Sequence, residues 1–185
     1  NFKLRHICVF SIKKLMKSKR NLVLLGMMGS GKSTIGSLLS RELDVKFFDI
    51  DSCIEKQLNM RIKEIFEKRG EVFFRNIEEK ITMKSLNSKN AVISLGGGAF
   101  LNEKIRKEVL SNNFSFWLNW GTNKILSRIK KNKKRPIAFN LNNKELIELI
   151  IKRSKIYSKA ETKINCNNLT KTEIVKLILK LYEKN

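Results

Sequence analysis

Short apolar runs alternate along the chain with longer segments in which apolar residues recur every three or four positions. The runs predict buried strands and the longer segments predict amphipathic helices. The predicted strands are residues 22–25, 45–50, 91–95, 114–118 and 162–166. The predicted helices are residues 33–43, 51–58, 62–68, 71–86, 102–110, 122–130, 144–159 and 170–183. This alternation predicts an α/β fold, a three-layer α/β/α sandwich around a central five-stranded parallel sheet.

The chain of 185 residues fits one domain with a short extension. Residues 1–20 carry many lysines and arginines and no acidic residue, so we interpret them as a basic N-terminal extension that need not be ordered. Residues 21–185 are the predicted single domain. Residues 131–143 are polar, basic and contain the chain's one proline, which predicts a mobile loop within that domain.

The charge balance is strongly basic, with 39 lysines and arginines against 17 acidic residues and a formal net charge of +22. Such a charge is typical of proteins that bind nucleic acid. The lysines, however, are scattered, and aromatic residues are not interleaved with them as stacking platforms. We therefore favour solvated lysines over a specific nucleic-acid partner, and note that positive potential also suits an enzyme with anionic substrates.

The three cysteines, Cys8, Cys53 and Cys166, are far apart and lack metal-ligand spacing. This predicts reduced thiols, as in the cytoplasm. No run of about 18 apolar residues is present, so no membrane span is expected.

A phosphate-binding motif follows the first predicted strand. Residues 26–33 read GMMGSGKS and match the pattern G-x-x-x-x-G-K-[ST] at every required position. Its backbone N–H groups and the start of the next helix favour bound phosphate. Lys32 is expected to reach the β- and γ-phosphates of Mg-ATP, and the Ser33 hydroxyl is expected to bind Mg²⁺.

Two carboxylates, Asp49 and Asp51, end the second predicted strand. We assign Asp49 to the Mg²⁺ shell through water, and Asp51 to the hydroxyl of an acceptor, as hydrogen-bond acceptor or general base. The alternative is that one of them caps the following helix.

An anion-binding cradle is predicted farther along the chain. The three glycines of residues 96–98 follow a buried strand, where they allow a ligand to approach the backbone. Arg75 and Glu78 are spaced to pair on one helix, which would orient the guanidinium for a carboxylate or phosphate. Arg153 is a second candidate. Arg135, inside the basic loop, is predicted to close over the transferred phosphoryl group.

These motifs together resemble the shikimate kinase family of P-loop enzymes over nearly the whole chain from residue 21. The resemblance rests on residues 26–34, FDID at 48–51, FRNIE at 74–78, SLGGG at 94–98, Arg135-Pro136 and residues 153–157. It implies the P-loop NTPase fold and transfer of the ATP γ-phosphoryl group to the 3-hydroxyl of shikimate, with Mg²⁺ as cofactor.

The resemblance also implies roles for single residues. Lys32, Asp51 and Arg135 would be catalytic, and Ser33 and Asp49 would serve the metal. ATP would be bound by Gly29, Ser30, Gly31, Lys32, Ser33, Thr34, Arg128 against the adenine, and Arg135 in the lid. Shikimate would be bound by Asp51, Arg75, Gly97, Gly98 and Arg153, with Phe66 and Phe74 lining the pocket.

Four other interpretations remain open at this stage: a gluconate kinase, a nucleoside-monophosphate kinase, a basic P-loop protein that binds nucleic acid, and a relative that has lost activity. A gluconate kinase would not need paired arginines for a ring carboxylate. The sequence departs from the family pattern at Asn76 and in the lysine-rich lid, and Asn167 and Asn168 match too weakly to name adenine contacts. We expect a cytoplasmic monomer.

Overall fold

A parallel sheet forms the centre of the computed structural model, which describes residues 20–131 and 141–183. Its strands are β1 Leu22–Leu25, β2 Lys46–Asp49, β3 Ala91–Ser94, β4 Phe114–Asn119 and β5 Thr162–Asn165. They lie in the order β2-β3-β1-β4-β5, and every neighbouring pair is parallel. The predicted five-stranded parallel sheet is therefore confirmed.

The sheet carries an apolar core on each face. Along β1, Val23 and Leu25 belong to one buried cluster, whereas Leu22 and Leu24 belong to the other. A strand covered on both faces must be apolar at every position, which explains the unbroken run that identified β1 in the sequence.

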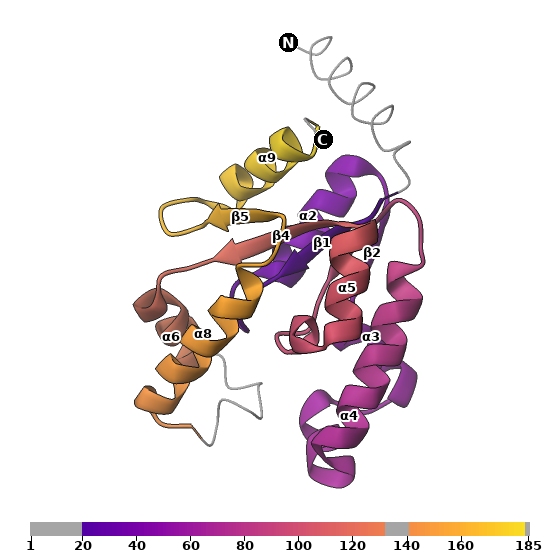
Figure 1. Cartoon of the computed structure of the whole chain (residues 1–185), viewed down its shortest axis with the longest axis vertical. Helices are drawn as coiled ribbons and strands as arrows, with labels where there is room; N and C mark the ends of the chain where they lie inside the picture. Colours follow the sequence, from indigo (N-terminus) through magenta and orange to yellow (C-terminus); the bar gives the residue numbers. More distant parts are fainter. Residues whose placement is uncertain (1–19, 132–140, 184–185) are drawn as a thin grey trace.

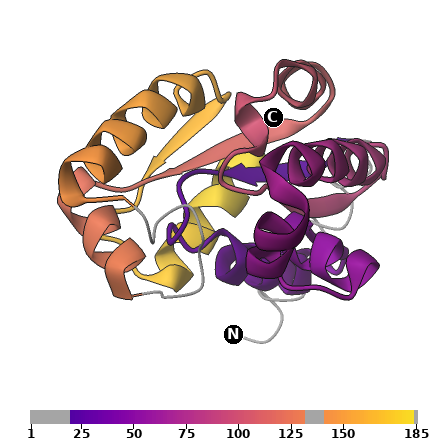
Figure 2. The ribbon, with the colours of Figure 1, turned by 90° about the horizontal axis from the view of Figure 1, so that it is seen from below.

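Helices cover both faces, as the predicted three-layer sandwich requires (Figures 1 and 2). One face packs against α2 Lys32–Leu43 and α9 Lys171–Tyr182. The other packs against α3 Ile50–Leu58, α4 Ile62–Leu86, α5 Glu103–Asn112, α6 Thr122–Lys131 and α8 Asn143–Tyr157. A short 3₁₀ helix, η1 Ala99–Leu101, was not predicted.

Most helix boundaries agree with the sequence within one or two residues. The two predicted helices 62–68 and 71–86 both fall within α4, which is kinked between them at Gly70, where the backbone is non-helical with φ 78° and ψ 172°. A glycine adopts this positive φ at little cost, so it breaks the helix where the sequence predicted a break. The lid predicted at 131–143 is bounded by the end of α6 and the start of α8, and its residues 132–140 lie outside the described part of the chain.

The segments after β1, β2 and β3 converge on one edge of the sheet because the strands are parallel. The loops after β1 and β3 carry the phosphate motif and the glycines 96–98, and the junction of β2 with α3 carries Asp49 and Asp51. Ligands bind at this edge in open parallel sheets. Within residues 20–131 and 141–183, no helix combines the length and the apolar composition that a membrane span requires.

At the opposite edge of the sheet, the side chain of Asn21 links several elements through hydrogen bonds. Its side chain is 1% exposed, donates to the backbone carbonyls of Leu86 and Ser88 and to Asn113 Oδ1, all at 2.8 Å, and accepts from the backbone N–H of Ala91 at 3.1 Å. This one amide therefore joins the starts of β1, β3 and β4 to the end of α4.

Replacing Asn21 with alanine is expected to lower the free energy of unfolding by about 2–4 kcal/mol, because it leaves several buried polar groups without partners. Urea denaturation measures the change. Asn112→Ala is the matched control, since exposed Asn112 bonds only to Glu108 in the described structure and should change stability by less than about 0.5 kcal/mol. Equal effects of both substitutions would contradict the role given to Asn21.

Candidate active site

The phosphate motif forms a loop between β1 and α2. Gly29 and Gly31 have φ of 77° and 92°, a left-handed backbone that suits glycine and lets the loop wrap around a ligand. Lys32, in the first turn of α2, is only 7% exposed, and its Nζ donates to the carbonyls of Gly26 and Met27 at 2.8 and 3.0 Å. The ammonium group therefore lies within the loop, next to the position of a bound phosphate. Ser33 and Thr34 follow it and are exposed.

The two aspartates separate into different positions. Asp49 ends β2 and caps α3, because its side chain accepts from the N–H of Ser52 at 3.2 Å. The helix-cap interpretation therefore holds for Asp49, and its metal role stays a prediction. Asp51, in the first turn of α3, lines a pocket beside the loop.

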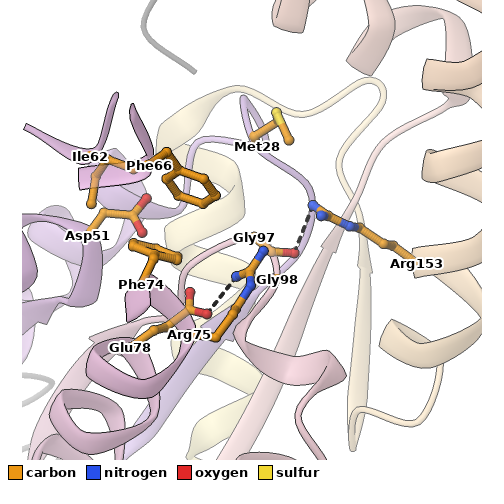
Figure 3. A pocket seen from close by; sticks show the side chains of 10 residues that line it. All are labelled: Met28, Asp51, Ile62, Phe66, Phe74, Arg75, Glu78, Gly97, Gly98 and Arg153. Atoms are coloured by element: carbon orange, nitrogen blue, oxygen red, sulfur yellow. Dashed lines mark hydrogen bonds and ion pairs between the residues drawn. The ribbon is translucent and has the colours of Figure 1, made fainter. Parts of the chain in front are cut away.

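This pocket brings together residues from five parts of the chain (Figure 3). It has about 400 Å³ of empty space, its open mouth included. It is lined by Met28, Asp51, Ile62, Phe66, Phe74, Arg75, Glu78, Gly97, Gly98 and Arg153. All five acceptor-site residues predicted from the sequence thus line one pocket.

Arg75 is held in place by two carboxylates. Its guanidinium contacts Glu78 at 2.7 Å and Glu71 at 2.9 Å, which confirms the predicted pair with Glu78. Glu78 is 2% exposed. Burial raises the pKa of Glu78, and the Arg75 guanidinium offsets part of that rise. An arginine whose three guanidinium nitrogens all donate to these carboxylates keeps one orientation toward the pocket (Figure 3).

Arg153 reaches the pocket from α8 on the opposite side. It is 5% exposed, and one of its terminal nitrogens donates to the carbonyl of Gly97 at 3.2 Å. Its Nε is buried and, in the described part of the chain, has no hydrogen-bond partner. A buried cationic group with unused donor capacity is suited to an anionic ligand.

Tyr157, one turn later on α8, also donates its hydroxyl to the carbonyl of Gly97. Burial raises the pKa of Tyr157 to about 12, so the hydroxyl keeps its proton at neutral pH. No role for this side chain was predicted from the sequence.

Two of the three glycines, Gly96 and Gly98, lie too close to charged side chains to carry a Cβ. A Cβ added at Gly96 would lie 2.3 Å from Glu78 Oε1 and 3.0 Å from Asp51 Oδ1. One added at Gly98 would lie 2.5 Å from an Arg75 nitrogen. Any larger residue would displace the charged groups that form the pocket.

Two aromatic rings and two aliphatic side chains form the apolar part of the pocket. The Phe66 and Phe74 ring centroids are 4.6 Å apart and the rings are tilted, which places both at the pocket as the sequence predicted. Met28 and Ile62 also line it. They were not predicted from the sequence. Met28 occupies a position of the phosphate motif that is open to any residue, and Ile62 is one of several apolar residues of a helix, so neither is marked as a ligand contact.

A second region adjoins the loop on the side of α6. Arg128 donates to the carbonyl of Gly29 at 3.4 Å, and its guanidinium lies 3.8 Å from the ring centroid of Trp120. Asn167 accepts from the N–H of Gly121 at 2.7 Å. Arg128 is therefore next to the phosphate loop, whereas the predicted lid residue Arg135 lies outside the described residues.

The chain matches the family model described as shikimate kinase over residues 28–183. The shikimate kinase of Persephonella marina is 39% identical over 160 residues, which are 86% of this chain and 97% of that protein. That of Bacillus subtilis is 39% identical over 167 residues, 87% of this chain and 88% of the relative.

Comparison with solved structures leads to the same family. The shikimate kinase of Acinetobacter baumannii, in complex with shikimate, has a TM-score of 0.87 at 30% identity and covers 94% of this chain and 98% of its own. A gluconokinase from Sinorhizobium meliloti has a TM-score of 0.58 at 14% identity, with 90% and 93% covered, and this likeness shows the fold alone.

The raised pKa of Glu78 predicts a pH-dependent stability. The folded chain holds this proton more tightly than the unfolded chain, so the stabilising contribution is complete at low pH and is lost as the pH rises through the folded-state pKa. The unfolding free energy of the wild type minus that of Glu78→Gln should therefore fall as the pH rises above about 4.3, the ordinary pKa of a glutamate.

Glu103→Gln is the control of opposite sign. The hydrogen bond and charge of Lys107 lower the pKa of Glu103, so its contribution is present at neutral pH and is lost as the pH falls. Denaturation at several pH values compares the two variants. The same trend in both would show that Glu78 is not the source.

Proposed function

The chain belongs to the shikimate kinase family, and we propose how its own residues carry out the phosphorylation of shikimate by ATP. The chain is an ATP-dependent kinase with the P-loop fold. The observation that carries the assignment of roles is the pocket itself, in which Asp51, Arg75 and Arg153 meet beside the phosphate loop.

Shikimate has a carboxylate and ring hydroxyls, and the pocket offers matching groups at opposite ends. Arg75 and Arg153 bind the carboxylate, because both line the pocket and both are held in place by neighbouring groups. Gly97 and Gly98 let the ring approach their backbone. The rings of Phe66 and Phe74 bound the apolar face of the site.

Asp51 accepts the hydrogen bond of the 3-hydroxyl and is the proposed acceptor of its proton. The hydroxyl oxygen forms a bond to the γ-phosphorus while the bond from that phosphorus to the β–γ bridging oxygen breaks, which yields shikimate 3-phosphate and ADP. Lys32, inside the loop, stabilises the charge on the β- and γ-phosphates. Arg135 is the proposed lid arginine.

The oxygen donors near the loop fit Mg²⁺. Mg²⁺ usually keeps several waters and binds one or two carboxylates together with substrate phosphates. The described residues contain no cluster of three or more His, Cys, Asp or Glu side chains that could hold a metal, which agrees with such a sparse site. Ser33 would bind the ion directly and Asp49 through water, and the ion would offset phosphate charge.

The loop residues Gly29 to Thr34 bind ATP, and Arg128 lies against its base. We further propose a monomer without a specific nucleic-acid partner. A reducing compartment such as the cytoplasm is supported by Cys53 and Cys166, which are both free thiols.

Acceptor specificity tests the function directly. ADP release from Mg-ATP is measured in parallel with shikimate, gluconate, AMP or no acceptor. Shikimate alone should raise the rate far above the background. Release with gluconate or AMP instead would keep the phosphate loop argument and reject the acceptor site.

Substitutions of Asp51 and of Arg153 should have different kinetic effects. Asp51→Asn should lower kcat by about 10²–10⁴-fold, because it removes the group that receives the hydroxyl proton. Arg153→Ala should raise KM for shikimate roughly 10- to 100-fold, which is the loss of a charge-assisted hydrogen bond. Steady-state kinetics with each substrate varied separates the effects.

Arg41→Ala is the control for arginine loss, because Arg41 is exposed on α2, on the other face of the sheet. It should leave both constants within about twofold of the wild type. Equal losses of ATP and shikimate binding in Asp51→Asn and Arg153→Ala would contradict the roles given to these residues.

A further inference from the structure

Trp120 connects the phosphate loop to the helix that carries Arg128. It lies between the end of β4 and the start of α6, and its indole N–H donates to the carbonyl of Ser30 in the loop at 2.9 Å. The side chain is partly buried and packs against both core clusters. A ring held on several sides in this way keeps one orientation.

The hydrogen bond to Ser30 fixes a peptide plane of the loop. In a trans peptide the carbonyl of Ser30 and the N–H of Gly31 point in opposite directions, and no cis peptide bond occurs among the described residues. Because Trp120 holds the carbonyl on its own side, the N–H of Gly31 is directed away from Trp120. Loop N–H groups are the donors that hold nucleotide phosphates.

The indole ring also supports Arg128. The guanidinium lies 3.8 Å from the ring centroid, a distance typical of a cation over an aromatic face. A planar guanidinium has two faces, and Arg128 is only partly buried, so the face away from Trp120 can stack on a second planar group. Lys124, at 5.3 Å from the same ring, adds a further cation to it.

We propose that Trp120 is a positioning residue of the nucleotide site, which orients the Gly31 N–H toward the phosphates and supports the Arg128 guanidinium so that its outer face stacks on the base. The proposal rests on the proposed function in that the loop binds ATP. It adds Trp120 as a residue that does not contact the reacting atoms of either substrate and acts through Ser30 and Arg128.

Two substitutions separate the two contributions. Trp120→Phe keeps a ring under Arg128 but removes the indole donor, and Trp120→Leu removes both. Trp120→Phe should raise the Kd of ATP and of inorganic tripolyphosphate about fivefold each, which is the loss of one hydrogen bond. Trp120→Leu should raise the Kd of ATP by about a further threefold, through the lost support of Arg128, and that of tripolyphosphate no further.

Trp117→Phe is the matched control. Trp117 lies on β4, is buried in one core cluster and contacts no loop residue through a hydrogen bond that the structure records. It should leave the Kd of both phosphate ligands within about twofold of the wild type. In this background Trp120 is the one remaining tryptophan of the chain's two, and ADP should change its fluorescence.

A merely structural role predicts a different result. Thermal unfolding of every variant and KM for shikimate are measured beside the Kd values, and KM should stay within about twofold in Trp120→Phe. Parallel losses for ATP and shikimate would overturn the proposal. Unchanged ATP binding in the Trp120 variants would also overturn the proposal. Tighter ATP binding would overturn it as well, because it would mean that the Trp120 ring occupies the place of the base and inhibits binding.

The outcome is independent of the acceptor. If the chain binds ATP with the expected dependence on Trp120 but phosphorylates a compound other than shikimate, the inference stands and the acceptor assignment fails. If shikimate is phosphorylated and the Trp120 variants bind ATP like the wild type, the acceptor assignment stands and the inference about Trp120 fails.

Discussion

The close approach of charged side chains to the backbone of Gly96, Gly97 and Gly98 is the contact on which the acceptor site depends. Glu78, Asp51 and Arg75 lie where a Cβ at Gly96 or Gly98 would be, and Arg153 binds the carbonyl of Gly97. α3, α4 and α8 therefore supply functional groups to one strand end only because that strand ends in residues without side chains.

The same crowding explains the electrostatics. Glu78 is nearly enclosed, and burial raises its pKa, whereas contact with Arg75 favours the charged form. A buried carboxylate is costly without such a partner. Burial therefore opposes the charge on Glu78, the contact with Arg75 offsets part of that cost, and the same contact limits the orientations of Arg75. Arg153 differs, since part of its donor capacity remains unused among the described residues.

The phosphate loop shows a related dependence on its surroundings. Its sequence motif sets the glycines and Lys32, and the positive φ values of Gly29 and Gly31 follow from that motif. The orientation of the Ser30–Gly31 peptide, in contrast, is tied to Trp120, some ninety residues away along the chain. A contact at that separation leaves no mark in the local pattern of either segment.

The sequence alone predicted the layers, the parallel sheet, the phosphate loop and seven of the residues that line the acceptor pocket. The layers, the sheet and the loop follow from local periodicity, glycine backbone freedom and motif spacing, all of which act over a few neighbouring residues, whereas the residues of the pocket were assigned together by the resemblance to a known family. The tertiary structure decided that Asp49 caps α3 while Asp51 lines the pocket, and it assigned Tyr157 to the carbonyl of Gly97 and Trp120 to that of Ser30. These contacts join segments far apart in the chain, so they depend on how the helices pack against the sheet rather than on the composition of any one segment.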